Sequence, residues 1–169
     1  ETWQHTNFKM NEKIKLFFIY VSYIFILFAI DRVTKFQVLA ILESQDKVDI
    51  YINSFLNLYL VWNKGIGFGL FSFDNTTAYN LITLIILFIN VIIVYLIFVE
   101  EGVKVYFLLT ILGGSLGNFV DRLYYKAVPD FIDINYNGYH WFIFNVADIF
   151  ITLGTVSYTH LRAHETNSN

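Results

Sequence analysis

The sequence predicts an all-α membrane bundle of four transmembrane helices, with a small extracytoplasmic β-sheet (a β-cradle) between helices 1 and 2. Of its 169 residues, 56% are hydrophobic and only 15% are charged, whereas a soluble domain typically has about 25% charged residues. Four apolar stretches are long enough, or nearly so, to cross the roughly 30 Å of bilayer hydrocarbon. One segment between the first two stretches alternates between apolar and polar residues, which is typical of a half-buried strand.

Composition excludes several classes of protein. Disorder requires low hydrophobicity, so the chain is expected to fold, and its length fits one domain. The absence of cysteine from the sequence removes disulfides, thiolate metal sites and cysteine nucleophiles. A net charge of −3 provides no basic surface, so no nucleic-acid partner is expected.

The predicted spans contain few charged residues. The first span begins uncharged and then continues through Asp31, Arg32 and Lys35 to residue 42. The second has no charge and is the clearest span, whereas the fourth contains Asp148 among apolar neighbours. The four predicted spans are residues 16–30 (or 16–42), 78–99, 103–120 and 142–156.

The ends of the chain set the expected orientation and domain limits. Lys13 and Lys15 precede the first span, so the positive-inside rule places the N-terminus in the cytoplasm. Four spans return the C-terminus to the same side. We expect one membrane-embedded domain over residues 10–156, a leader or cloning remnant over residues 1–9, and a polar tail foreign to the fold over residues 157–169.

The segment between the first two spans predicts the sheet. Residues 48–53 alternate between apolar and polar side chains, and residues 55–62 are rich in aromatic and apolar ones. Gly65, Gly67 and Gly69 follow, and they permit a turn or a close approach of the backbone. We therefore expect a small sheet on the outer face of the membrane.

Three glycines on the third span predict close helix packing. Gly113, Gly114 and Gly117 are spaced so that they form one small-residue face. Such a face lets another helix approach closely, so a neighbouring helix is expected against it.

Polar side chains at membrane depth are costly, so each is a candidate for function. Asn118 and Arg122 are four residues apart and share one helical face near the outer end of the third span. Asn145 and Asp148 are three residues apart at the start of the fourth, and Asp130 lies in the connecting segment. Two carboxylates, those of Asp130 and Asp148, are therefore expected to converge near the outer leaflet.

A pair of carboxylates can hydrolyse a peptide by acid–base catalysis. Two aspartates in close contact cannot both ionise, so they share one proton. One, as the base, deprotonates a water molecule, while the other, as the acid, donates a hydrogen bond to the scissile carbonyl. No serine–histidine arrangement competes, because three of the four histidines lie in the terminal segments and His140 stands alone in a predicted loop.

Some charged residues have a plain structural interpretation. Asp121 is expected to form a local ion pair with its neighbour Arg122 and to cap the third span. Asp31 and Lys35 are four residues apart on a helix, which favours a structural ion pair between them.

Two further positions leave alternatives open. Asp133 is expected to be a loop carboxylate at the membrane interface, although it could instead tune the pair of aspartates. Asn63 with Gly65 either forms a simple turn or belongs to the site.

Five motifs occur in order along the chain. Together they resemble those of the lipoprotein signal peptidases, the type II signal peptidases of bacteria, which are four-span membrane aspartyl proteases. The resemblance covers roughly residues 13–155. The motifs are DRVTK at residues 31–35, NKGIGF at 63–68, GGSLGNFVDR at 113–122, VPDF at 128–131 and FNVAD at 144–148.

The resemblance implies a role for each matching residue. Asp130 and Asp148 match the catalytic dyad of the family. The supporting residues that it implies are Asn118, Arg122 and Asn145 in the polar shell that positions substrate and carboxylates, Asn63 and Gly65 in the β-cradle, and Asp31 with Lys35 in a structural or substrate-facing pair.

The resemblance also implies partners and location. The expected substrate is a diacylglyceryl-modified prolipoprotein, cut just before the lipid-modified cysteine, and no metal or organic cofactor is implied. We expect a monomer among the lipids of the bacterial cytoplasmic (inner) membrane, with its active site near the outer face.

The main alternative is a small membrane ion or metal transporter. It would use Asp130, Asp133 and Asp148 as oxygen ligands. Such a transporter would place carboxylates along a path through the membrane, but the second span has none. This favours the peptidase.

Overall fold

A computed structural model describes residues 2–65, 76–136 and 139–167 of the chain. This part of the chain contains four helices and a four-stranded sheet. The elements, in order, are α1 (Thr2–Gln45), β1 (Asp49–Asn53), β2 (Leu56–Asn63), α2 (Thr76–Val99), α3 (Val103–Tyr125), β3 (Val128–Tyr136), β4 (Tyr139–Phe144) and α4 (Val146–Asn167).

Three helices in the described part of the chain are long and apolar enough to cross a membrane. They are Asn11–Gln45 within α1, and the whole of α2 and α3. Large apolar side chains such as Phe25, Phe88 and Phe98 project outward from them and are mostly exposed, as expected of surfaces that face lipid tails. The second half of α4 is polar, and this helix is not among those that are long and apolar enough to cross a membrane.

The predicted start of the fourth helix at residue 142 is wrong. Residues 142–144 belong to strand β4, and α4 runs from Val146 to Asn167, beyond the predicted end at residue 156. A short apolar run fits a strand as well as a helix, so composition alone places this boundary badly.

A reciprocal cap fixes where α4 begins. The Asn145 side-chain oxygen accepts a hydrogen bond from the backbone N–H of Asp148 at 3.1 Å, and the Asp148 carboxylate accepts one from the backbone N–H of Asn145 at 3.1 Å. This is a capping box, in which an N-cap residue and the residue three positions later satisfy each other's backbone. Such caps contribute about 1 kcal/mol.

The sheet has four antiparallel strands in the order β1-β2-β3-β4. Strands β1 and β2 confirm the two strands predicted before the second helix. Strand β3 and the start of β4 lie in the segment predicted as a loop connection between the third and fourth spans, so that prediction is wrong. Because β2 pairs with β3, the end of β2 near Asn63 lies next to the start of β3 near Asp130.

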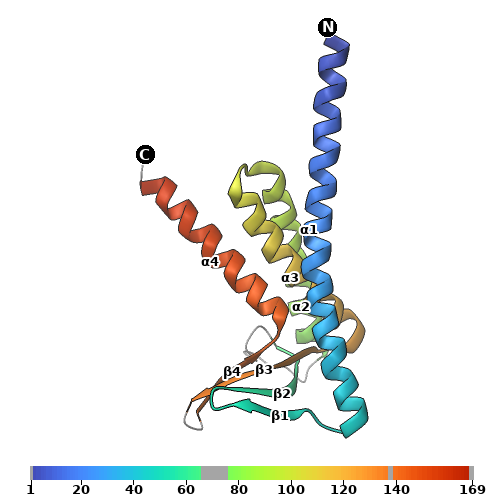
Figure 1. Cartoon of the computed structure of the whole chain (residues 1–169), viewed down its shortest axis with the longest axis vertical. Coiled ribbons are helices and arrows are strands. Elements are labelled where there is room, and N and C mark those ends of the chain that lie inside the picture. The colour runs from blue at the N-terminus through green and yellow to red at the C-terminus, as the bar shows by residue number, and fades with distance from the viewer. Residues whose placement is uncertain (1, 66–75, 137–138, 168–169) are drawn as a thin grey trace.

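The sheet lies at one end of the helix bundle. Figure 1 shows that the start of α1 and the end of α4 both lie at the end of the bundle away from the sheet. The end of α1 leads into β1, and β4 leads into α4. The buried residues Val38, Val48 and Phe131 pack together where α1 meets the sheet.

The predicted close helix packing at the glycines of α3 is confirmed, but against two helices and not one. A Cβ atom at Gly113 would lie 2.9 Å from the Leu27 side chain of α1, and one at Gly117 would meet the Asp31 carboxylate. A Cβ atom at Gly114 would lie 2.5 Å from the backbone oxygen of Ala147 on α4. These glycines therefore bring α1 and α4 against α3.

Replacing Gly114 with alanine tests this packing. We expect Gly114→Ala to lower the free energy of unfolding by about 1–3 kcal/mol, because the added methyl group meets backbone that cannot rotate away. Gly113→Ala is the matched comparison, since its closest approach is longer, 2.9 Å to Cβ of Leu27 instead of 2.5 Å to a backbone oxygen, and we expect a smaller loss there. Thermal unfolding in detergent micelles measures both, and an equal loss in the two variants would contradict the explanation.

Candidate active site

Five of the residues predicted for the site line one cavity at the sheet end of the bundle. Its volume is about 420 Å³. Asn63 comes from β2, Asn118 and Arg122 from α3, Asp130 from β3 and Asp148 from α4. The remaining walls are mostly aliphatic: Ile86, Ile89, Ile93, Ile111, Val128 and Ile151, with Ser115, Thr152 and Thr155.

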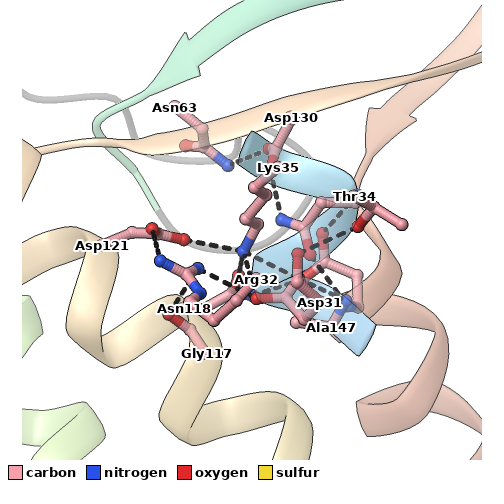
Figure 2. Close-up of polar contacts among 12 residues, drawn as sticks. Asp31, Arg32, Thr34, Lys35, Asn63, Gly117, Asn118, Asp121, Asp130 and Ala147 are labelled. Atoms are coloured by element: carbon pink, nitrogen blue, oxygen red, sulfur yellow. Dashed lines mark hydrogen bonds and ion pairs between the residues drawn. The ribbon is translucent and has the colours of Figure 1, made fainter. Parts of the chain in front are cut away.

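Asp130 is held by two amide side chains. Asn145 donates from Nδ2 to Oδ1 of Asp130 at 2.6 Å, and Asn63 donates from Nδ2 to Oδ2 at 2.8 Å. The aspartate is only 2% exposed. Figure 2 shows Asn63 and Asp130 directed toward each other from neighbouring strands.

Asp148 is held by two more N–H groups. Asn118 donates from Nδ2 to Oδ1 of Asp148 at 2.8 Å, and the backbone N–H of Asn145 donates to Oδ2. Asn145 therefore contacts both aspartates, one through its side chain and the other through its backbone. All four carboxylate oxygens of the two aspartates accept a hydrogen bond.

The environment of Asp130 favours its protonated form. Burial, and secondly the negative charge of Asp148, raise the pKa of Asp130 from its usual 3.8 to about 7. The hydrogen bonds from Asn63 and Asn145 and the charge of Lys35 lower this pKa only in part. A carboxyl group that can hold a proton near neutral pH, beside a second carboxyl, suits general acid–base chemistry.

A buried ion network lies behind the aspartates. Lys35 lies 3.0 Å from the Asp31 carboxylate and 2.7 Å from that of Asp121, while Arg32 lies 2.9 Å from Asp31 and 2.6 Å from Asp121. The predicted Asp31–Lys35 pair is confirmed. Asp31, Lys35 and Asp121 are at most 1% exposed, so their charges balance inside the protein.

The predicted ion pair between Asp121 and its neighbour Arg122 is wrong. Adjacent residues on a helix point in different directions, and Asp121 faces α1, where it meets Arg32 and Lys35 (Figure 2). Arg122 faces the cavity and donates to the backbone oxygen of Gly65 at 2.6 Å. Its Nε and Nη1 atoms are buried without a hydrogen bond in the described structure.

Asn63 and Gly65 form a turn and also belong to the site. The Asn63 side-chain oxygen accepts a hydrogen bond from the backbone N–H of Gly65 at 2.8 Å, which leaves its amide nitrogen for Asp130. Both interpretations of this motif therefore hold. Gly67, Gly69 and the rest of the motif after residue 65 lie outside the described residues.

Asp133 and His140 differ from expectation. Asp133 is buried on strand β3 rather than placed in a loop, and its carboxylate lies 2.8 Å from Nδ1 of His140 on β4. His140 is therefore neither in a loop nor alone. Asn57 of β2 donates to the same carboxylate oxygen at 3.4 Å. Asp133 does not line the cavity that contains Asp130 and Asp148.

Sequence reasoning missed two kinds of site residue. The isoleucines that form the cavity wall on α2 are indistinguishable in sequence from those that face lipid. Tyr79 was also missed, although its hydroxyl donates to the backbone oxygen of Arg122 at 3.0 Å and joins α2 to the site. The sequence feature that could have identified Tyr79 is an aromatic residue with a hydroxyl group near the start of an apolar helix. Among the described residues, no group of three His, Cys, Asp or Glu side chains is arranged to hold a metal ion.

Comparison with protein families and with known sequences gives a consistent result. Residues 23–161 match the profile of the family described as signal peptidase (SPase) II. The chain is 50% identical over 141 residues to the lipoprotein signal peptidase of Pelagibacter ubique, covering 83% of this chain and 85% of that protein. It is 36% identical over 151 residues to that of Francisella tularensis subsp. novicida, covering 87% and 90%.

Solved structures show the same similarity. A structure described as a bacterial membrane enzyme at 2.3 Å resolution superposes with a TM-score of 0.71 and 28% identity, over 89% of this chain and 91% of that one. Another bacterial membrane enzyme, at 1.9 Å resolution, superposes with a TM-score of 0.62 and 30% identity, over 82% and 88%.

The buried ion network can be tested by removing one charge. We expect Lys35→Met to lower the free energy of unfolding by about 3–5 kcal/mol, because it leaves two buried carboxylates with one cation. The charge-balanced variant Lys35→Met/Asp121→Asn should recover much of this loss. Thermal unfolding in detergent measures both, and a single variant that melts like the parent protein would refute the argument.

Proposed function

The chain belongs to the signal peptidase II family, and we propose that Asp130 and Asp148 are the two carboxylates with which it cuts its substrate. It is an aspartic-type peptidase that removes signal peptides from prolipoproteins. One observation carries the proposal for the two aspartates. Both lie in one cavity, and Asn145 donates a hydrogen bond to each of them.

The proposed reaction uses one proton between the two carboxyl groups. The ionised aspartate removes a proton from a water molecule, and the resulting hydroxyl oxygen attacks the scissile carbonyl carbon. The protonated aspartate donates its hydrogen bond to the carbonyl oxygen and stabilises the negative charge that develops there. The tetrahedral intermediate then collapses and the C–N bond breaks. The aspartate that took the proton from water passes it to the leaving amine, which returns the pair to its starting state.

The other residues at the cavity are proposed to position the substrate and the carboxylates. Asn63, Asn118 and Asn145 hold the aspartates through their amide groups. The free N–H groups of Arg122 face the cavity and can donate to backbone carbonyls of an extended peptide. Gly65 accepts from Arg122 and so keeps the guanidinium in place.

We propose a diacylglyceryl-modified prolipoprotein as the substrate, cut just before the lipid-modified cysteine. The aliphatic cavity walls on α2, α3 and α4 support this, since they suit an apolar segment that arrives from within the bilayer. Lipid chains contribute about 0.8 kcal/mol per buried methylene, so they would hold such a substrate in the membrane plane. Surrounding lipids are then the medium through which the substrate reaches the site.

The proposed placement is a four-span monomer in the cytoplasmic (inner) membrane of a bacterium. Both termini would be cytoplasmic, which is supported by Lys13 and Lys15 before the first span and by the common end at which α1 begins and α4 ends (Figure 1). The sheet and the aspartates would then lie near the outer face. A signal peptide that enters from the cytoplasmic side presents its cleavage site at that depth.

Replacing either aspartate tests the catalytic proposal. We expect Asp130→Asn and Asp148→Asn each to lower cleavage of a diacylated prolipoprotein by at least about 10³-fold, since an amide can neither take up nor release the catalytic proton. Mass analysis of the released signal peptide by purified variants measures this loss.

Asp133→Asn is the matched control. It removes a buried carboxylate three residues from Asp130 on the same strand, but outside the cavity. We expect it to retain cleavage. Normal processing by Asp130→Asn or by Asp148→Asn would refute the assignment of these two aspartates as the catalytic pair.

The raised pKa of Asp130 predicts a pH dependence. Because cleavage needs one proton on the pair, and Asp130 loses its proton above pH 7 or so, kcat/KM should fall by about tenfold per pH unit on the alkaline side. A pH–rate profile of the detergent-purified enzyme measures this. The control variant Asp133→Asn is expected to show the same fall of kcat/KM on the alkaline side. A profile that stays flat well above that pH would contradict the prediction.

A further inference from the structure

Three asparagines donate to the two aspartates, and each has its own oxygen held by another donor. The oxygen of Asn63 accepts from the backbone N–H of Gly65, and that of Asn145 accepts from the backbone N–H of Asp148. The oxygen of Asn118 accepts from Nζ of Lys35 at 2.8 Å. When a donor binds the oxygen of an amide, the NH₂ group of that amide points away from the donor. These three donors therefore direct the NH₂ groups of the three asparagines toward the carboxylates.

Lys35 differs from the other two donors. It is a charged side chain from a different helix, α1, whereas the others are backbone groups close in sequence to their asparagines. An ammonium group can only donate hydrogen bonds, so the Asn118 oxygen has to face it. The chain of contacts then runs from Lys35 to Asn118 at 2.8 Å and from Asn118 to Asp148 at 2.8 Å (Figure 2 for the first step).

We infer that Lys35 is a positioning residue for the proposed catalytic pair: it orients the Asn118 amide so that this amide donates to Asp148, which keeps Asp148 in its carboxylate form as the base. The inference rests on the proposed roles of Asp130 and Asp148. It assigns Lys35 a function in the reaction besides its ion pairs with Asp31 and Asp121.

The surroundings of Asp148 support the same assignment. This aspartate lies in the first turn of α4, where the helix dipole favours a negative charge. The charged groups around it are Asp31 and Lys35 on α1 and Asp130 on β3. On the far side of Lys35 is Asp121. Arg122 lines the same cavity, and α2 carries no ionisable group other than its tyrosines.

The ion network explains how Lys35 can do this while buried. The carboxylates of Asp31 and Asp121, together with Arg32, form a network of ion pairs in which opposite charges lie beside Lys35. Asp31 also accepts a hydrogen bond from the backbone N–H of Ala147 at 3.1 Å, which ties the same network to the start of α4. Lys35 is thereby fixed relative to Asp148 by contacts on both sides.

A pair of variants isolates the contribution of Lys35. Lys35→Met/Asp121→Asn and Asp121→Asn both lack the Asp121 charge, but only the first lacks the contact with Asn118. Relative to Asp121→Asn, we expect the acid limb of the kcat/KM profile of the double variant to move to higher pH by about one unit. We also expect its maximum kcat/KM to fall roughly tenfold. A lysine that only stabilises the fold would lower activity equally at every pH, and a lysine that acts only through its charge would shift the limb equally with and without Asn118.

Asn118→Ala tests the route and leaves the ion network intact. It should move the acid limb in the same direction as the loss of Lys35, because the carboxylate loses the same donor. In the Asn118→Ala background, removing Lys35 together with Asp121 should cause a clearly smaller shift, relative to removing Asp121 alone, than it does when Asn118 is present, because only the direct effect of the Lys35 charge remains. This double-mutant cycle reports the coupling between the two residues directly.

Three results would overturn the inference. One is an acid limb that is the same in Asp121→Asn and in the double variant, which would leave Lys35 a purely structural residue. Another is an Asn118→Ala variant whose limb stays at the position of the parent enzyme, a result that overturns the inference even if the double variant does not fold. The third is a Lys35 effect that persists in full without Asn118. Failure of the catalytic proposal is read separately, from cleavage by Asp130→Asn or Asp148→Asn.

Discussion

The hydrogen bonds of Asn145 connect the fold to the chemistry of the site. Its side-chain oxygen caps α4, its amide nitrogen holds Asp130 at 2.6 Å, and its backbone N–H holds Asp148. The start of a helix and the spacing of two carboxylates therefore depend on the same few atoms. Because Asn145 lies between the end of β4 and the start of α4, it links the sheet, α4 and the cavity.

Small residues make it possible to bury the charges behind the site. The absence of a side chain at Gly117 leaves room for the Asp31 carboxylate, which also accepts a hydrogen bond from Ala147 on α4. Close approach of α1, α3 and α4 thus brings carboxylates to the cations and N–H groups that compensate them. A larger residue at Gly117 would separate these partners, and an unpaired buried charge is far more costly than a lost methylene contact.

Features that depend on local sequence could be predicted, and features that depend on distant pairing could not. The apolar helices, the first two strands and the Asp31–Lys35 pair all follow from periodicities within a few residues. Strands β3 and β4 were missed because two buried aspartates in β3 break the usual alternation. Asp121 contacts Lys35, 86 residues away, and Asp133 contacts Asn57, 76 residues away, so neither contact follows from a local pattern. For the candidate site, both aspartates and all three asparagines were predicted, but their mutual contacts were not.

With Asp130 and Asp148 as the proposed catalytic pair, the double role of Asn145 has a consequence for inhibition. A small molecule whose polar contacts are confined to Asp130, Asp148 and the Asn145 amide would bind only groups that the proposed reaction or the cap of α4 requires. Substitution of Asn145 would disturb the cap and both carboxylates together. The aliphatic wall of the cavity is different, because an isoleucine there can be exchanged for valine or leucine at little cost in folding. Substitutions that confer resistance to an inhibitor are therefore expected in the aliphatic wall of the cavity. Compounds that depend least on contacts with this wall should retain their potency longest.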